Sequence, residues 1–349
     1  MSEIQAELPP LEERPLVTFA LFAYNQEKYI REAIEGAFAQ TYEPLEIILS
    51  DDCSTDRTFE IMEEMAAGYD GPHYVNVRRN SCNLGVLKHV IHAVREARGD
   101  FIVLAAGDDI SRPMRTSRLV EMWLQGFDGV YSNYDLIDAE SELVATNRCP
   151  LGSASSRLPW LKNVSCDHFV YGATSSYAKN IIGGLVEPQQ MIQSEDTPIN
   201  TVLHVKGRTV GYISESLVAY RIHSETLSTS TQVPAQLGLI VEHEINEQRK
   251  AERHYALMVY MRELLSTLQA SKSPSVSIDL HSIEREIEFS FLKARWIRLS
   301  LLERLKTAFA TRNRAVLKWS LPRLAGIWVY GMLKWIHRIV CRESYGEVK

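Results

Sequence analysis

The feature that most constrains the fold is an alternation of two patterns between Leu16 and about Asp138. Apolar runs rich in β-branched and aromatic residues alternate with segments whose apolar residues recur at helical spacing. Strands separated by helices of this length predict βαβ units, an α/β fold class and a mostly parallel central sheet. The expected strands are VTFALFAY, LEIILS, HYVNVRR, FIVLAA and GVYSNYDLI, and the expected helices span Gln26–Gln40, Arg57–Ala67 and Leu84–Arg98.

The remaining chain divides into three regions of different pattern. Residues 1–15 form an acidic, proline-containing tail without the apolar segment of a signal peptide. Residues 139–233 are less regular and contain short expected strands at Thr209–Ile213 and Leu217–Tyr220. Residues 234–349 have a mostly helical pattern, interrupted at Ser271–Ser277 and at Pro322. We therefore expect one α/β domain over 16–233, with halves 16–138 and 139–233, and a helical C-terminal extension.

Charge is distributed unevenly along the chain. The net charge is −6, yet residues 293–342 combine twelve Lys or Arg with one acid, Glu303, and with several Trp and Tyr. Basic and aromatic residues together are typical of helices that lie on anionic membrane surfaces. Packing against the domain or against a second copy of the chain is the alternative, and no nucleic-acid-binding motif accompanies this region.

The composition also bears on localisation. No run reaches the roughly 18–20 apolar residues that a membrane span requires, and none of the five cysteines forms a C-x-x-C pair. These features predict a cytoplasmic protein, peripheral on the cytoplasmic face of the membrane if the basic extension binds lipid.

Polar clusters follow the expected strands at the edge where an open parallel sheet binds its ligands. The first strand-to-helix turn, Ala23–Lys28, contains no glycine, and the chain has neither G-x-G-x-x-G nor G-x-x-x-x-G-K-[ST]. Dinucleotide binding and P-loop chemistry are thereby disfavoured, and a carboxylate-held divalent cation is the expected means of handling phosphate. The clusters are Ala23-Tyr24-Asn25, Asp51-Asp52-Cys53-Ser54-Thr55-Asp56, Asn83-Leu84-Gly85 and Gly107-Asp108-Asp109.

Each cluster also has a purely structural interpretation. Asn25 is placed to cap the first expected helix, and Ser54 or Asp56 to cap the second. Asp109 could likewise cap the next helix or turn, although a carboxylate directly after an apolar strand is costly unless paired or metal-bound.

Six motifs occur in an order that resembles a known family. A strand ending in AYN is followed by IILSDDCSTDRT, RRNSCNLG, ARGDFIVLAAGDDI, SEDT and YRIHSETLS. From Pro15 to Ser228 this order is similar to the family 2 glycosyltransferases of the GT-A fold. The resemblance implies an inverting transferase that moves a sugar from a nucleotide-sugar donor to a hydroxyl of a glycan or lipid-linked acceptor, as in surface polysaccharide assembly.

The resemblance implies a set of donor-binding residues. Either Asp51 or Asp52 would accept hydrogen bonds from the base, and Gly85 would let the backbone approach the nucleotide, unless it serves only as a turn. The donor would be a UDP-, GDP- or dTDP-sugar. The full implied set is Ala23, Tyr24, Asn25, Asp51, Asp52, Asn83, Gly85 and Asp108.

The resemblance also implies a Mg²⁺ or Mn²⁺ ion, held in the family by a D-x-D motif. The aligned triplet here is Ala106-Gly107-Asp108, so the first acid is missing and Asp109 follows the last. One carboxylate with diphosphate oxygens and water can still hold such an ion. The implied ligands are Asp108, Asp109 and His223, and Arg221 is expected to approach the diphosphate or to form a salt bridge at a loop edge.

The acidic pair Glu195-Asp196 corresponds to the family's catalytic pair. Inverting transfer needs one carboxylate that takes a proton from the acceptor hydroxyl, and Asp196 is the expected base, with Glu195 in support. The same residues could instead start a helix, because acids in a first turn are common caps. Two alternative functions stay open at this point: a nucleotidyltransferase, and a non-catalytic sugar-nucleotide-binding protein.

Overall fold

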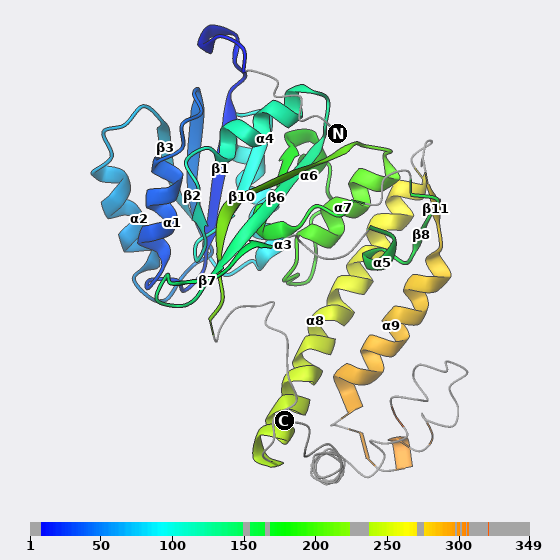
Figure 1. The fold of residues 1–349 in the computed structure, drawn as a ribbon. Coiled ribbons are helices and arrows are strands. Elements are labelled where there is room, and N and C mark those ends of the chain that lie inside the picture. The colour runs from blue at the N-terminus through cyan, green and yellow to red at the C-terminus, as the bar shows by residue number, and fades with distance from the viewer. Residues whose placement is uncertain are drawn as a thin grey trace, which may run out of the picture. The chain divides into compact units, whose positions relative to one another are not determined.

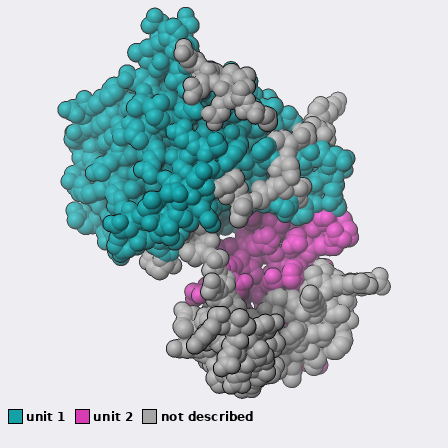
Figure 2. Space-filling view, viewed as in Figure 1, with its two compact units in different colours: residues 1–227, 263–279 teal, residues 228–262, 280–349 magenta. Residues whose placement is uncertain are grey.

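The computed structural model describes residues 8–148, 154–164, 168–223, 237–270 and 276–296, together with single residues and short pieces between 299 and 320. The chain forms two compact units (Figure 2). Met1–Leu227 and Glu263–Asp279 make the first unit, and Ser228–Arg262 and Leu280–Lys349 make the second.

A mixed but mostly parallel sheet forms the centre of the first unit (Figure 1). Within the described residues its strands lie in the order β3-β2-β1-β4-β9-β6-β10-β5, and β7 pairs with β6. Strands β3, β2, β1 and β4 are mutually parallel, as are β6 and β10, while β9, β5 and β7 run antiparallel to their neighbours. The strands are β1 Val17–Ala23, β2 Leu45–Asp51, β3 Tyr74–Arg79, β4 Phe101–Ala106, β5 Ile110–Ser111, β6 Gly129–Ile137, β7 Leu143–Arg148, β9 Ser176–Ala178 and β10 Val210–Arg221.

The expected α/β fold class and mostly parallel sheet are confirmed. All five strands expected before residue 138 are present, within one or two residues of the expected ends. The two short strands expected near residues 209–220 are a single strand, β10, whose pairing with β6 is interrupted between Ile213 and Val218. A bulge allows the long strand to bend without ending, and the sequence pattern shows this bend as a break.

Helices cover both faces of the sheet, because the strands bury both sets of alternating side chains (Figure 1). Side chains of α1, α2 and α4 share one core with Phe19, Leu21 and other odd-numbered residues of β1. Helix α3 lies on the opposite face, where His89 contacts Phe22 and Ser50. The helices are α1 Ile30–Phe38, α2 Thr58–Ala67, α3 Val86–Glu96, α4 Arg115–Leu124, α5 Ala154–Arg157, α6 Lys179–Gly183 and α7 Asp196–Val205, with 3-10 turns η1 Leu11–Glu13 and η2 Gly172–Thr174.

The described part of the extension is helical, as expected. Helix α8 spans Leu237–Ala270 and α9 spans Leu280–Arg295, so the expected interruption at Ser271–Ser277 separates two helices. The division into units differs from the expected boundary at 233, because Glu263–Asp279 belong to the first unit. There β11, Ser277–Ile278, pairs with β8, Leu161–Lys162.

Most of the basic segment 293–342, including Pro322, lies outside the described residues. Among its described residues, Lys293 lies 4.2 Å above the ring of Phe289, and Arg304 lies 5.9 Å from the ring centre of Trp296. None of the helices that the structure describes has both the length and the apolar character needed to cross a membrane.

Candidate active site

The parallel strands bring the expected clusters to one edge of the sheet. Ala23 is paired with Asp51 at the ends of β1 and β2, and Phe22 is paired with Ala106 at the end of β4. His223 lies two residues beyond the end of β10. Because these strand ends adjoin along the sheet, residues 115 and 189 positions apart in the sequence are brought into contact, His223 with Asp108 and Arg221 with Glu32.

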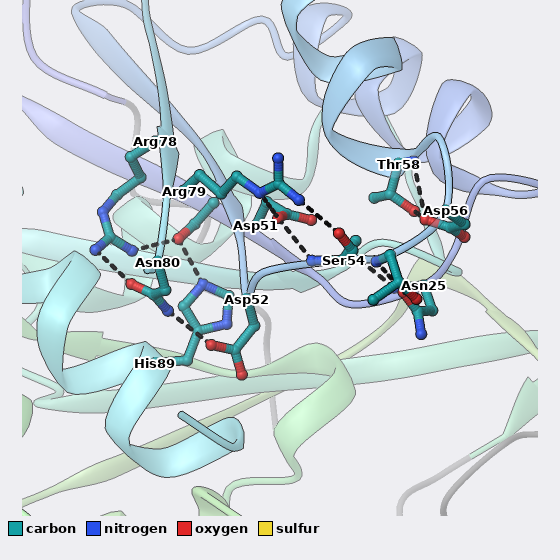
Figure 3. Close-up of polar contacts among 12 residues, drawn as sticks. Asn25, Asp51, Asp52, Ser54, Asp56, Thr58, Arg78, Arg79, Asn80 and His89 are labelled. Atoms are coloured by element: carbon teal, nitrogen blue, oxygen red, sulfur yellow. Dashed lines mark hydrogen bonds and ion pairs between the residues drawn. The ribbon is translucent and has the colours of Figure 1, made fainter. Parts of the chain in front are cut away.

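The loops after β1 and β2 hold each other in place (Figure 3). The backbone N–H of Asn25 donates to Ser54 Oγ at 2.9 Å, and Asn25 Oδ1 accepts from the N–H of Thr55 at 2.8 Å. Asp56 accepts hydrogen bonds from the backbone N–H groups of Glu27 and Thr58. These contacts place the two loops in a fixed arrangement before any ligand binds.

Two expectations for this region, the start of the first helix and its cap, are wrong. Helix α1 begins at Ile30 rather than at Gln26, and Asn25 does not cap it. Asn25 has a φ of 53°, a conformation that asparagine tolerates better than most residues, and its side chain instead fixes the neighbouring loop. Asp56 does bond the first N–H of α2, as expected. Tyr24 is 43% exposed, and Asn25 is exposed too, although its Oδ1 is already bonded to the N–H of Thr55.

Asp51 is fully buried at the end of β2. Its Oδ2 accepts the N–H of Ser54 at 2.9 Å and lies 3.2 Å from Nε of Arg79. Its Oδ1 is buried and has no hydrogen-bond partner among the described residues. A buried acceptor without a partner is costly, so a donor group supplied by a ligand or water would stabilise this oxygen.

Asp52 holds the turn before α3. Its Oδ1 accepts from Asn80 Nδ2 at 2.7 Å (Figure 3). The same oxygen accepts from the N–H of Leu84 at 2.9 Å, and Oδ2 accepts from the N–H of Gly85 at 3.0 Å. Asn83 Oδ1 accepts a second bond from the same Gly85 N–H at 3.0 Å. The Asn83–Gly85 turn therefore depends on a carboxylate from the neighbouring strand.

Gly85 is required at this turn for two reasons. Its φ is 76°, which a side chain makes unfavourable, and a Cβ would lie 2.4 Å from Cγ of Met191. One turn later the N–H of Leu87 donates to the carbonyl of Ile192 at 3.1 Å. The turn held by Asp52 thus lies directly against the segment that leads to Glu195 and Asp196.

Asp108 and Asp109 have different environments despite being adjacent. Asp108 Oδ2 lies 3.1 Å from Nε2 of His223, whose ring is packed against Tyr29 with ring centres 4.9 Å apart. Asp109 is buried, and its Oδ1 accepts the backbone N–H of Arg221 at 2.9 Å. Burial, and next the negative charge of Asp108, raises the pKa of Asp109 well above its ordinary value.

Asp109, also expected as a metal ligand, has one carboxylate oxygen bonded to the backbone. Its Oδ1 accepts the N–H of Arg221, while its Oδ2 is buried without a hydrogen-bond partner among the described residues. Asp108 and His223 converge. The described residues contain no group of three or more His, Cys, Asp or Glu side chains arranged to hold a metal ion.

Arg221 has the second of its two expected roles, because it forms a salt bridge with Glu32 and does not approach a diphosphate site. Its side chain is fully buried, and Nε donates to the carbonyl of Asp108 at 2.8 Å. Its Nη1 donates to Ser141 Oγ at 2.8 Å and to the carbonyl of Asp138 at 3.1 Å, and its Nη2 to Glu32 Oε2 at 3.0 Å. Because these contacts occupy the guanidinium, Arg221 positions the loop that carries Asp108 and is not open to a ligand.

Glu195 and Asp196 begin helix α7. Asp196 Oδ1 accepts from Ser194 Oγ and from the N–H of Thr197, both at 2.6 Å. The interpretation of this motif as a helix start is thus correct, and it involves only Oδ1 of Asp196. Oδ2 takes no part in those bonds. The two interpretations are compatible, since the bonds to Oδ1 also fix the orientation of the carboxylate.

Glu195 has an unusual environment for a carboxyl group. Its Oε1 lies so close to Gly172 that a Cβ there would be 2.4 Å away. The surrounding protein, and next the charge of Asp196, raises the pKa of Glu195 to about 7. A carboxyl group with a pKa near neutrality can exist in both protonation states under ordinary conditions.

A continuous set of contacts joins the acidic pair to the end of β4. The 3-10 turn η2, which begins at Gly172, follows Tyr171 and packs against β4, β6 and β10. Buried Arg115 donates to the carbonyl of Leu104 at 2.7 Å and to that of Ala173 at 3.4 Å. Through these contacts one guanidinium holds both the strand preceding Asp108 and the turn η2, against which the Glu195 carboxyl group lies.

Three residues of this region escape prediction from sequence. Arg79 bonds Asp51 and the carbonyl of Ser54, Arg115 joins two backbone segments, and Gly172 makes room for Glu195. The two consecutive arginines at the end of β3 could have indicated that Arg79 belongs to the site, because a charged pair at a strand end lies at the same edge of the sheet as the other clusters. No local pattern marks Arg115 or Gly172, whose partners are distant in sequence.

Comparison with known proteins agrees with this architecture. Residues 18–177 match the family described as glycosyl transferase family 2. The uncharacterized protein Rv1520 of Mycobacterium tuberculosis is 30% identical over 219 residues, which cover 58% of this chain and 57% of that protein. An uncharacterized glycosyltransferase of Haemophilus influenzae is 23% identical over 288 residues, covering 79% of this chain and 83% of its own.

The fold is shared with a solved glycosyltransferase structure. GalNAc-T7, in a crystal structure with UDP, GalNAc and Mn²⁺, has a TM-score of 0.53 and 14% identity over 80% of this chain and 58% of that one. This similarity concerns the fold alone. The chain spans 57% of the length of the mycobacterial relative. Residues 18–177 of this chain are a glycosyl transferase family 2 domain, and the domain has the GT-A fold.

Proposed function

We propose that this protein transfers a sugar from a nucleotide-sugar donor to a hydroxyl group of a glycan or lipid-linked acceptor, with inversion at the anomeric carbon. One observation carries the proposal. Arg221 holds the loop that carries Asp108, which contacts His223, and Arg115 holds the turn η2, against which the Glu195 carboxyl group lies. Single displacement requires groups of both kinds, one to face the leaving diphosphate and one to face the acceptor hydroxyl.

The nucleotide would lie over the ends of β1 and β2. The exposed ring of Tyr24 is suited to stack on the base, and the unpartnered Oδ1 of Asp51 or the remaining lone pairs of Asp52 are suited to accept its N–H. Ala23, Asn25, Asn83 and Gly85 would contribute backbone shape beside the ribose. GalNAc-T7 was solved with UDP, and a UDP-, GDP- or dTDP-sugar is the donor class that we propose.

Asp108 and His223 would hold a divalent cation, with the remaining positions filled by diphosphate oxygens and water. Mn²⁺ accepts both carboxylate and imidazole ligands, and Mg²⁺ keeps several ligands outside the protein, so the two residues fit either ion. When bound, the cation supplies positive charge against the leaving diphosphate. Mn²⁺ is present in the GalNAc-T7 structure.

Asp196 would take the proton of the acceptor hydroxyl. Its Oδ1 is fixed by Ser194 and Thr197, which leaves Oδ2 as the atom that receives the proton. Glu195, in its neutral form, would keep negative charge away from Asp196 and can donate a hydrogen bond to the acceptor.

Replacement of the base tests the proposal. Asp196→Asn should lower kcat by about 10²- to 10⁴-fold, the usual contribution of a general base, while the dissociation constant for donor with Mn²⁺ changes little. Donors are first identified by a thermal-shift screen of UDP-, GDP-, dTDP- and CMP-sugars. Asp70→Asn, which removes an exposed carboxylate elsewhere, is the matched control. Full turnover by the Asp196→Asn variant would refute the assignment and favour a non-catalytic binding protein.

For the basic extension we propose a peripheral membrane role on the cytoplasmic face, where a lipid-linked acceptor would be presented. The support is the composition of residues 293–342. The full chain should sediment with vesicles that contain anionic phospholipid and release at high salt. Equal sedimentation with neutral vesicles, or none with either, would contradict this role.

A further inference from the structure

Three partly exposed tyrosines form a cluster beside the acidic pair. The rings of Tyr134 and Tyr171 are stacked with centres 5.9 Å apart and planes at 17°. Tyr220 meets both rings edge-on, with centre-to-centre distances of 5.5 Å and 6.5 Å. Each of the three retains some solvent exposure. We name these residues the tyrosine cluster.

The tyrosine cluster lies between the two halves of the proposed active site. Tyr171 directly precedes Gly172, the residue against which the Glu195 carboxylate lies. Tyr220 precedes Arg221 on β10 and is three residues from His223. Tyr134 comes from the neighbouring strand β6, where the register pairs it with Val218, so Tyr134 and Tyr220 lie on the same face of the sheet. Tyr171 also lies within electrostatic reach of Asp196 and Asp109, so the cluster adjoins the proposed base and the loop that carries Asp108.

The electrostatic surroundings support this placement. Burial, followed by the nearby groups Tyr134 and Asp196, raises the pKa of Tyr171 above its ordinary value. Its phenol consequently remains a hydrogen-bond donor at any pH at which the protein is studied. The guanidinium of Arg157 lies 5.8 Å from the centre of the Tyr171 ring and 4.9 Å from that of Phe169, which adds a cationic group at one side of the cluster.

We propose that the tyrosine cluster binds the pyranose ring of a sugar substrate. A pyranose has an apolar face of C–H groups and a rim of hydroxyls, and a tyrosine offers a matching apolar ring with a polar end. Tyrosine also loses little conformational entropy on binding, because it has only two side-chain torsions. Packing alone does not require three phenol groups that keep contact with solvent at this position. This inference rests on the proposed function, because it assigns a substrate to the same site.

The pyranose can belong to either substrate, and two experimental arms distinguish the sources. In the acceptor arm, binding of methyl β-D-glucoside, methyl β-D-galactoside and methyl β-D-N-acetylglucosaminide is measured by saturation-transfer NMR, with and without UDP and Mn²⁺. In the donor arm, the dissociation constants of UDP-glucose and UDP-N-acetylglucosamine are compared with that of UDP alone. The variants are Tyr171→Leu and Tyr220→Leu, with Tyr171→Phe and Tyr220→Phe retaining the ring. Tyr74→Leu removes an exposed tyrosine on β3 and serves as the control.

The leucine variants should weaken binding at least about tenfold in one arm, while the phenylalanine variants stay within about threefold of the unchanged protein. Unchanged UDP binding and an unchanged melting temperature show that the variants are folded. Leucine variants that bind both the glycosides and the UDP-sugars as well as the unchanged protein would overturn the inference, as would an unchanged protein that binds no pyranose in either arm. If UDP itself does not bind, the result counts against the proposed donor. Binding of the methyl glycosides to the unchanged protein and to the leucine variants would then still test the tyrosine cluster.

Discussion

Glu195 makes the stability of this protein dependent on pH in a way that can be calculated. Its pKa is raised from an ordinary value of 4.5 to about 7 in the folded chain. Between those two values the folded protein retains a proton that the unfolded chain has lost. The free energy of unfolding should therefore fall as pH rises, by about 1.4 kcal/mol per pH unit within that interval. Between pH 5 and pH 8 the total is about 2–3 kcal/mol.

Glu195→Gln removes this dependence, because glutamine resembles the neutral acid at every pH. We expect the variant and the unchanged protein to have similar stability at pH 5. At pH 8 the variant should be more stable by about 2–3 kcal/mol, since the unchanged protein then carries two adjacent carboxylates, Glu195 and Asp196, in a desolvated position. The stabilisation by neutral Glu195 is thus complete below pH 4.5 and is lost as pH rises through 7.

Urea denaturation followed by tryptophan fluorescence at pH 5, 6, 7 and 8 measures the effect, with the free energy in water obtained by linear extrapolation. Glu63→Gln, an exposed residue of α2, controls for the removal of one carboxylate. Its difference from the unchanged protein should not vary with pH. Parallel stability curves for the unchanged protein and the Glu195→Gln variant, with less than about 0.5 kcal/mol of change between pH 5 and pH 8, would refute the reasoning.

Two further predictions follow from the same region. Asp108→Asn and His223→Asn should each weaken donor binding by tenfold or more when Mn²⁺ is present but only slightly in EDTA, as measured by calorimetric titration. This follows from the 3.1 Å contact between the two side chains, and an equal loss with and without Mn²⁺ would argue against a shared cation. Gly172→Ala should displace the Glu195 carboxylate, because the new Cβ would lie 2.4 Å from Oε1. Since only the end of a flexible side chain has to move, the melting temperature should change by no more than about 2 °C while kcat falls at least tenfold, and an unchanged kcat would contradict the assigned role of Glu195.

Much of the architecture could be predicted because it depends on local pattern. The apolar runs are buried on both faces of the sheet, and helical periodicity between them requires crossovers, which fixes the parallel order of β1 to β4. The same rule placed the clusters at the carboxyl ends of the strands. Helix boundaries were less predictable. The helix expected from Gln26 begins at Ile30. The N–H groups of Asn25, Gln26 and Glu27 are bonded by side chains of the loop after β2 and of the first residue of α2, which the sequence does not show.

The roles of individual polar residues were harder to predict, because they depend on which way a side chain points. Asp108 and Asp109 look equivalent in the sequence, and the backbone turn after β4 directs one toward His223 and the other toward the N–H of Arg221. Arg221 and His223 are two residues apart, and from sequence Arg221 is expected either to face the same ligand as His223 or to form a salt bridge at a loop edge. The fixed end of β10 buries Arg221 among carbonyl groups, and the chain beyond it carries His223 to Asp108.

The two buried arginines explain how a site with one acid of the D-x-D motif missing can still be ordered. In a typical D-x-D site the metal itself draws two carboxylates together. Here Arg221 donates to the carbonyl of Asp108 and Arg115 to those of Leu104 and Ala173, so backbone on both sides of the site is held by protein groups. Each guanidinium is fully buried, and removing either would leave several carbonyl groups without partners. The backbone at Asp108 and at the turn beside Glu195 is therefore held by the folded chain itself, and the cation that we propose would supply charge rather than structure.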